Sequence, residues 1–244
     1  MTNEPFAASP EQLRALQELV LSTNTLQEFL GHVAGQAAGI GPELSCGITV
    51  SGDPRRPLTV GSSDATAAQF DETQYSHGEG PCLEAMHTGK VIEVNDATNE
   101  TRWSAYIANA IDQGLGASLS TPITANGADI GVINLYAMRP RTFTAEERAR
   151  AQTFAGQAAA AIAVATRLAH HTRLADELRT AMASRATIDQ ALGILMGERR
   201  CTADEAFAVL RKMSQDTNTK LRDVATALIT RTTGQPPRAA PPLN

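Results

Sequence analysis

The feature that most constrains this chain is a long stretch with almost no helix-breaking residue. Between Thr144 and Gly193 the sequence contains no proline and a single internal glycine, Gly156. Thr144-Ala145-Glu146-Glu147 has the form of a capping box, in which a threonine and a glutamate three positions later bind each other's free backbone N–H groups at a helix start. The stretch therefore predicts one long helix over 144–183, about 60 Å in length at the standard rise per residue.

The second half of this helix carries a recurring set of side chains on one side. Five residues are spaced alternately by three and four positions, namely Leu168, His171, Ala175, Leu178 and Met182. This spacing is typical of a helix that packs lengthwise on another helix. We expect the segment to pair two copies of the chain as a parallel homodimer. The alternative is a helix that folds back on its own domain.

The residues before the long helix alternate between helical and strand patterns. A first helix in segment 1–21 begins at Ser9-Pro10, where a serine cap precedes a proline at the first helical position, and a second begins at a capping box at Thr25. Further helices are expected at 64–74, from Cys82 and at 103–113, and strands at 44–50, 58–61, 91–94, 118–124 and 130–136.

Two turn signals indicate how the strands connect. Asn126-Gly127 separates the last two strands, and both residues tolerate the positive φ angles of a tight hairpin turn. Ser51-Gly52-Asp53-Pro54 predicts a turn between the first two strands. Helices around a meandering antiparallel sheet predict an α+β domain over 22–165, which includes the start of the long helix.

The C-terminal segment 184–232 contains three helical patterns in quick succession. A capping box at Thr202-Ala203-Asp204-Glu205 begins the second of them. We expect a bundle of three short helices around one small core, followed by a proline-rich, disordered tail over 233–244. The apolar faces consist of Ile188, Ala191, Leu192, Leu195 and Met196, then Ala206, Phe207, Leu210 and Met213, then Leu221, Val224, Ala225 and Leu228.

Charge is unevenly distributed along the chain. The formal net charge is −5, yet the segment from Ser184 to Arg231 holds eight basic and six acidic residues, so it carries +2 and the remainder −7. The overall charge argues against a chain coated in nucleic acid, whereas the C-terminal segment is mildly basic. The chain has no apolar run long enough to cross a bilayer, and its N-terminus lacks the pattern of a secretory signal. We therefore expect a cytoplasmic protein without a membrane partner.

The C-terminal segment also matches a known family at many positions. The matching residues are Arg185, Ile188, Ala191, Gly193 to Met196, Glu205 to Phe207, Leu210, Arg211, Lys220, Leu221, Val224 and Ala225. In these residues it resembles the ANTAR domain, the RNA-binding output module of bacterial transcription antiterminators. The resemblance implies binding to paired hairpins in nascent RNA, which keeps a terminator from forming and so affects RNA polymerase indirectly. Family members commonly have lysine where this chain has Leu192, so a contact made by that lysine is absent here.

Cationic and amide side chains are the groups that recognise the phosphates and bases of an RNA loop. They gather at the expected start of the last helix, where the helix dipole and free N–H groups also favour phosphate. The alternative for each residue is a solvated surface position. A dimer would present two mildly charged modules to two adjacent loops. The expected RNA contacts are Asn218, Thr219, Lys220 and Arg222, and the candidates to extend this surface are Arg185, Arg211, Lys212, Arg199 and Arg200.

The order of elements over 22–165 and three short motifs indicate a second family. The motifs are Gln74 to Cys82, Arg102-Trp103 and Ser118 to Pro122. They resemble the GAF domains that actinobacterial proteins pair with ANTAR domains. The resemblance implies a sensor that binds a small ligand, of unknown identity, between a sheet and its covering loops.

Aromatic walls with a few polar groups are typical of pockets for small molecules. Gly78-Glu79-Gly80-Pro81 brings Cys82 to a helix start, whose dipole is expected to lower the pKa of the thiol; the alternative is an inert packed thiol. The cysteines Cys46, Cys82 and Cys201 lack the spacing of zinc ligands, so no metal site is expected. The expected pocket residues, each with a rim or core position as the alternative, are Tyr75, His77, Glu79, Cys82, Trp103 and Ser118.

These features predict a regulator and not an enzyme. A signal at the GAF-like domain would change the pairing of the long helices and thereby RNA binding by the ANTAR-like module. One alternative is a DNA-binding protein, because three short helices also suit helix-turn-helix domains. Another is a redox enzyme or sensor, because some GAF domains reduce free methionine sulfoxide; Cys82 and Cys46 could serve if their Cα atoms lie within about 7 Å. The sequence leaves the target transcripts and the direction of the response open.

Overall fold

The computed structural model of the chain describes residues 10–51 and 59–237. The chain divides into two compact units, and the division falls between His170 and His171, within helix α6 (Ala145–Arg199). Most of the turn predicted at Ser51-Gly52-Asp53-Pro54 and the end of the predicted tail lie outside the described residues. Within these residues no helix is both long and apolar enough to span a membrane.

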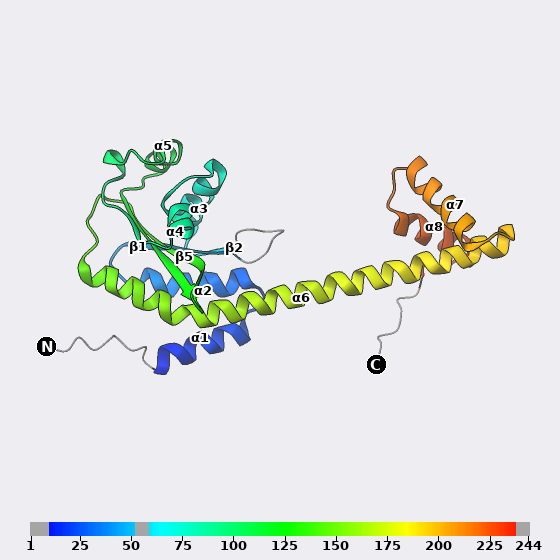
Figure 1. Cartoon of the computed structure of the whole chain (residues 1–244), viewed down its shortest axis with the longest axis horizontal. Helices are drawn as coiled ribbons and strands as arrows, with labels where there is room; N and C mark the ends of the chain where they lie inside the picture. Colours follow the sequence, from blue (N-terminus) through cyan, green and yellow to red (C-terminus); the bar gives the residue numbers. More distant parts are fainter. Residues whose placement is uncertain (1–9, 52–58, 238–244) are drawn as a thin grey trace. The chain divides into compact units, whose positions relative to one another are not determined.

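The first unit is built on a five-stranded antiparallel sheet (Figure 1). Asn126 and Gly127 form the turn between the last two strands with φ angles of 52° and 78°, which confirms the predicted hairpin turn. The α+β class is confirmed as well. Along the chain the strands are β1 (Leu44–Val50), β2 (Thr59–Ser62), β3 (Ile92–Val94), β4 (Ala117–Ala125) and β5 (Ala128–Ala137). In the sheet they lie in the order β2-β1-β5-β4-β3.

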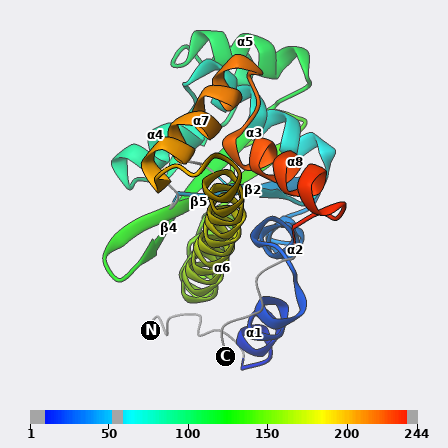
Figure 2. The same cartoon turned by 90° about the vertical axis from the view of Figure 1, so that its right-hand side faces the viewer.

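Helices cover both faces of this sheet. One face carries α2 (Leu26–Ala38) and the first part of α6, with α1 (Pro10–Ser22) against α2. Figure 2 looks along α6 and shows α2 beside it. The other face carries α3 (Ala65–His77), α4 (Pro81–Thr88) and α5 (Ser104–Asp112), preceded by a short 3-10 helix at Ala97–Asn99.

The two faces of the sheet differ in polarity because successive strand residues point to opposite sides. Toward α2 and α6, alternate residues of β1, β4 and β5 such as Ile48, Leu119 and Leu135 form one apolar core with residues of both helices. Toward α3, α4 and α5, the same strands present buried polar residues, namely Thr49, Ser118, Ser120, Asn134 and Tyr136.

The second unit is a bundle of three helices formed by the end of α6, α7 (Ala203–Asp216) and α8 (Leu221–Thr233). The predicted capping box of Thr202 and Glu205 begins α7. Two residues expected on the apolar faces, Met196 and Phe207, are instead 38% and 40% exposed. The core consists of Ala191, Leu195, Ala206, Leu210, Val224, Ala225, Leu228 and Ile229.

Helix α6 is longer than the sequence predicts. The helix expected over 144–183 and the first helix of the C-terminal bundle are continuous, and α6 ends only at Arg199. Ser184, which could have capped a new helix, donates its hydroxyl hydrogen to the Thr180 carbonyl at 2.8 Å. This bond attaches the serine to the preceding turn instead of starting a new one. The helix ends where Arg200 takes a left-handed φ of 52°.

Candidate functional site

A cluster of polar side chains is buried between the sheet and α3. Asp71 of α3 accepts hydrogen bonds at Oδ1 from the Tyr136 hydroxyl, at 2.6 Å, and from Nδ2 of Asn134, at 3.0 Å. Ser120 donates to Oδ1 of Asn134 at 2.8 Å, and Nε2 of Gln74 donates to the Tyr136 hydroxyl at 2.9 Å. These bonds form a connected network between α3 and strands β4 and β5.

Gln74 also connects α4 to this network. Its Oε1 accepts a hydrogen bond of 2.8 Å from the backbone N–H of Cys82, in the first turn of α4. A Cβ at Gly80, which has φ 144°, would lie 2.4 Å from that oxygen, so only glycine allows this approach. The motif from Gln74 to Cys82 therefore folds back on itself, because the Gln74 side chain accepts a hydrogen bond from a free backbone N–H group at the start of α4.

Asp71 is fully buried, and burial raises the pKa of its carboxyl to about 7, although the hydrogen bonds from Tyr136 and Asn134 act in the opposite direction. Its second oxygen, Oδ2, makes no hydrogen bond with the described residues. A buried carboxylate oxygen without a partner is costly. A proton on the carboxyl group would lower this cost, which agrees with the raised pKa of Asp71.

Cys82 is a packed thiol. It is fully buried, its Sγ lies 3.6 Å from Oγ1 of Thr49 and 3.9 Å from the Tyr75 hydroxyl, and that hydroxyl is hydrogen-bonded to Thr49. Burial, followed by the nearby Asp71 carboxylate, raises the pKa of Cys82 to about 12. The lowered pKa expected at the start of α4 is therefore wrong, because desolvation outweighs the helix dipole. Cys46 is also buried with a raised pKa.

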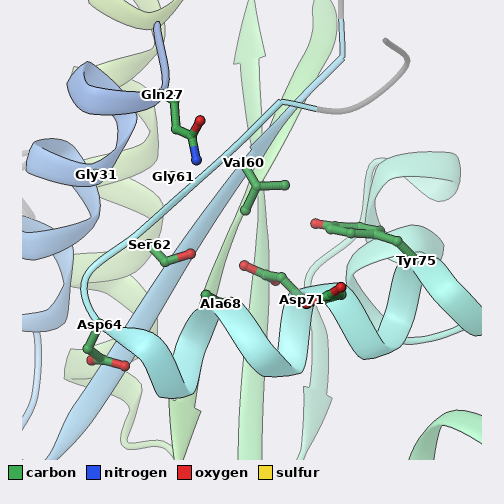
Figure 3. A pocket seen from close by; sticks show the side chains of 10 residues that line it. Gln27, Gly31, Val60, Gly61, Ser62, Asp64, Ala68, Asp71 and Tyr75 are labelled. Carbon is green, nitrogen blue, oxygen red and sulfur yellow. The ribbon is translucent and has the colours of Figure 1, made fainter. Parts of the chain in front are cut away.

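A groove of about 410 Å³ lies beside this cluster, between α2, β2 and α3 (Figure 3). Its wall on α3 carries Asp71 and Tyr75, whose polar ends are bonded to the sheet: Asp71 to Asn134 and Tyr136 of β5, and Tyr75 to Thr49 of β1. Asp64 and Glu72 line it as well, and Val60 supplies an apolar surface from β2. The groove thus combines carboxyl groups, one aromatic ring and an apolar strip.

A second candidate surface is the turn between α7 and α8. Asn218, Thr219, Lys220 and Arg222 are all exposed there. Lys220 is the N-cap residue of α8, and its side chain makes no capping hydrogen bond. The hydroxyl of Ser214 donates to the Thr219 carbonyl at 2.6 Å, which fixes the turn. The first N–H groups of α8 are thus free of a side-chain cap and are flanked by Lys220 and Arg222, with Asp223 3.9 Å from the Arg222 guanidinium.

Comparison with known proteins assigns both units. A family model of the GAF domain matches residues 23–163. The chain belongs to the GAF domain family. A model of the ANTAR domain matches residues 176–229, so the chain combines a GAF domain with an ANTAR domain, as the sequence predicts. ANTAR domains are RNA-binding antitermination modules and GAF domains are sensors. The actinobacterial subtype stays a prediction.

Several solved GAF structures are similar to this chain. The GAF domain of a phosphoenolpyruvate-protein phosphotransferase from Acinetobacter is 15% identical, with 70% of this chain and 99% of that chain covered and a TM-score of 0.48. That of a phosphoenolpyruvate-protein phosphotransferase from Coxiella burnetii is 21% identical, with 63% and 91% covered and a TM-score of 0.47. The free methionine-R-sulfoxide reductase from Neisseria meningitidis is 17% identical, with 69% and 99% covered and a TM-score of 0.44. No curated protein sequence matches the chain.

The residues predicted to line a ligand pocket in the GAF domain lie in different environments. Of the six, only Tyr75 lines the groove. Cys82 and Ser118 are fully buried, and the Ser118 hydroxyl has no hydrogen-bond partner among the described residues. Asp71 and Asn134, which are not among the predicted site residues, are bonded to each other and connect this interior to the groove wall. Asn134 could have been found from the sequence, because it is a polar residue at an inward position of an otherwise apolar strand.

The other three predicted pocket residues surround the start of α5 and the end of α3. Glu79 accepts hydrogen bonds from the backbone N–H groups of Ala105 and Tyr106, at 2.8 and 3.1 Å, and so caps α5. Trp103, the N-cap residue of α5 with φ 38°, lies beneath the Arg102 guanidinium at 4.3 Å. His77 is exposed at the end of α3, with Nδ1 2.9 Å from the Thr73 carbonyl.

The remaining predicted RNA contacts lie on other parts of the ANTAR domain. Arg185 is exposed on α6, 4.0 Å from Asp189, and Arg211 and Lys212 are exposed on α7. Leu192 is partly buried against the core of the bundle. The position where the family commonly has lysine therefore contributes to packing in this chain.

Proposed function

We propose that this protein is a transcription antitermination regulator that binds paired hairpins in nascent RNA under the control of a signal sensed by its GAF domain. It would act in the cytoplasm, where an RNA structure that forms in place of a terminator lets RNA polymerase continue. The observation that carries the proposal is the exposed start of α8 in the ANTAR domain, which has no side-chain cap and lies between Lys220 and Arg222. Free N–H groups at a helix start and adjacent cations suit RNA phosphates.

We include a homodimer in this proposal because of the surface of α6. Val164, Leu168, Leu178 and Met182 are 56%, 55%, 57% and 57% exposed, and their spacing places them along one side of the helix. Exposed apolar side chains in such a row favour pairing with an equivalent helix of a second copy. The net charge of +2 on one C-terminal segment predicts weak binding by a single copy, whereas two linked modules gain affinity through effective concentration.

Helix α6 also connects the sensing domain to the RNA-binding domain, so it can transmit a signal between them. Ala158 and Ile162 of α6 belong to the core of the GAF domain, and Ala191 and Leu195 of α6 belong to the core of the ANTAR domain. A ligand that prefers one pairing of the two α6 helices would therefore change the presentation of the RNA-binding modules. We propose a regulator and not a redox enzyme, because Cys82 is buried and its raised pKa disfavours the thiolate that redox chemistry requires.

Electrophoretic mobility shift with purified full-length protein tests the proposal. We expect binding to an RNA with two adjacent hairpins and much weaker binding to a DNA duplex of matching sequence. Lys220→Ala with Arg222→Ala should weaken RNA binding by at least about tenfold and reduce its salt dependence. Lys90→Ala with Arg139→Ala removes the same charge from exposed positions of the GAF domain and serves as the control. Preference for the duplex, or equal losses in both double variants, would contradict the proposal.

A further inference from the structure

The single aromatic side chain of the ANTAR domain lies on its surface. Phe207 of α7 is the only phenylalanine, tyrosine or tryptophan between residues 176 and 229, and it is 40% exposed. The core of the bundle forms without it, from aliphatic side chains such as Leu195, Leu210 and Leu228. A phenylalanine ring is among the side chains that gain most from burial. Its place on the surface leaves a flat, apolar face available to a partner.

Phe207 shares one side of α7 with residues that lead to the predicted RNA contacts. Arg211 and Ser214 follow it by four and seven positions, so the three side chains lie on the same side of the helix. Two hydrogen bonds connect Ser214 to Thr219: its hydroxyl donates to the Thr219 carbonyl at 2.6 Å, and its carbonyl accepts from the Thr219 N–H at 3.1 Å. This side of α7 therefore continues directly into the turn that precedes Lys220.

The charge along this side of α7 suits a nucleic-acid strand. Arg211 and Lys220 are exposed, and neither forms an ion pair with a residue that the structure describes. The acid Asp204 lies one turn before Phe207, at the end farther from these cations. In complexes with single-stranded RNA, cations bind the phosphates and aromatic rings stack on the bases. The helix rises about 10 Å from Phe207 to Ser214, a length that a few nucleotides of a loop cover.

A single base fits this position better than a protein segment does. A specific protein interface buries on the order of 1,000 Å² or more, with several apolar side chains at its centre. Met196 of α6 is the only further exposed large apolar side chain in the described bundle outside the row on α6, and the two fall far short of that area. The neighbours of Phe207 on the surface of α7 are small or polar, namely Ala203, Asp204, Ala208 and Arg211.

We propose that Phe207 stacks on one unpaired base of the RNA hairpin loop, while the backbone of the same loop runs along α7 past Arg211 to Lys220. This inference rests on the proposed RNA binding and names a residue that would recognise the loop as single-stranded. A paired base within a duplex has neighbours on both faces and leaves no face for the ring. Phe207 would thus make the ANTAR domain prefer a loop with a splayed base to a continuous duplex.

Affinities of full-length variants for an RNA with two adjacent hairpins, measured by fluorescence anisotropy, test the stacking role. Phe207→Leu keeps an apolar side chain but removes the ring, and it should weaken binding by at least about fivefold. Phe207→Tyr keeps the ring and should bind within about twofold of the wild type. Neither variant changes a charge, so their salt dependence should equal that of the wild type, whereas Lys220→Ala should reduce it. Met138→Ala, at an exposed apolar position of the GAF domain, is the control and should leave the affinity unchanged.

Two further measurements examine the contact itself. Replacing loop nucleotides one at a time by abasic sites should identify one position where the wild type loses affinity and Phe207→Leu loses little more, because both changes break the same contact. Phe207→Trp adds a second tryptophan to a chain that has one, and the emission of this second tryptophan should be quenched when the intact RNA binds.

Three results would overturn the inference. They are equal affinities of the wild type and Phe207→Leu, losses that simply add for every abasic position, and unchanged emission in the RNA-bound Phe207→Trp protein. The last result does not depend on how well Phe207→Leu folds, which circular dichroism measures. A wild-type protein that binds no hairpin RNA would instead disprove the proposed function, whereas a wild-type protein and a Phe207→Leu variant that bind RNA equally would disprove the stacking role alone.

Discussion

The carboxyl group of Asp71 lies in the space that a side chain at Gly47 would require: a Cβ at Gly47 would be 1.8 Å from Oδ2 of Asp71. Glycine at this position of β1 is therefore a condition for α3 to place a carboxyl group against the sheet. The buried polar network of the GAF domain depends on this approach, since Asp71 accepts the bonds from Tyr136 and Asn134.

Gly47→Ala should therefore destabilise the protein. Either Asp71 moves and breaks its two hydrogen bonds or β1 shifts, and we expect a loss of about 2–4 kcal/mol in the free energy of unfolding. Chemical denaturation followed by circular dichroism measures it. Gly35→Ala in α2 is the control, because a Cβ there meets no atom within 4 Å and alanine favours a helix. Equal denaturation midpoints for the two variants would contradict the predicted role of Gly47.

Asp71 should also make stability depend on pH. Its pKa is about 7 in the folded protein and about 4 in an unfolded chain. Between these values the native state keeps a proton that the unfolded state has lost, so stability falls as pH rises from about 4 to about 7 and then levels off. The full shift corresponds to at most about 4 kcal/mol. The titratable groups that face Asp71 do not add to this slope, because burial raises their pKa values and keeps them neutral; they are Cys46, Tyr75, Cys82, Tyr106 and Tyr136.

Asp71→Asn tests this pH dependence, since asparagine resembles the protonated carboxyl group. Unfolding free energies of the variant and the wild type should be similar near pH 4. At pH 8 the variant should be the more stable of the two, by up to a few kcal/mol. Urea titrations at a series of pH values measure the difference, and parallel pH profiles of the two proteins would disprove the assignment.

The exposed row on α6 predicts that the oligomeric state responds to single charges. Leu178→Glu, alone or with Leu168→Glu, should weaken or abolish the homodimer because two like charges would face each other across the pair. Analytical ultracentrifugation over a range of protein concentrations measures the dissociation constant. Thr180→Glu, an exposed position on the same helix but off the row, is the matched control. A monomeric wild-type protein, or equal dissociation constants for the two variants, would speak against the proposed pairing.

Burial predicts the order in which the cysteines react. Cys46 and Cys82 are buried, whereas Cys201 is partly exposed beside the bundle core of the ANTAR domain. Alkylation of the native protein with iodoacetamide should modify Cys201 first and leave the other two largely unreacted until the GAF domain unfolds. Mass spectrometry of peptides at increasing reaction times measures the order. Early modification of Cys82 would revive the redox alternative.

The sequence predicts correctly those features that depend only on residues close together in the chain. The turn at Asn126-Gly127 follows from the φ angles that these two residues tolerate, and the helix start at Thr202 from side chains that bond within one turn. Helix α6 continues beyond the end that the sequence predicts, because nothing before Arg200 stops a helix and the Ser184 hydroxyl donates back to the Thr180 carbonyl.

Local sequence patterns do not predict the buried polar network of the GAF domain, because its residues are far apart in the sequence. Asp71 and Asn134 are 63 residues apart in the sequence, and only the sheet register and the approach at Gly47 bring them together. Helical periodicity does not distinguish Asp71 from Glu72, the other acid of α3. The burial that raises its pKa, and the oxygen left without a hydrogen-bond partner among the described residues, are properties of the assembled fold.

The missing cap of α8 has a further consequence, for local motion. A capping side chain contributes about 1 kcal/mol to a helix start, and α7 has such a cap whereas α8 does not. The first turn of α8 should therefore open more often than that of α7 in the free protein, and its amides should exchange with deuterium sooner. A phosphate at this position would take the place of the absent cap. The first turn of α8, which should open most readily in the free ANTAR domain, is thus the part that bound RNA would order.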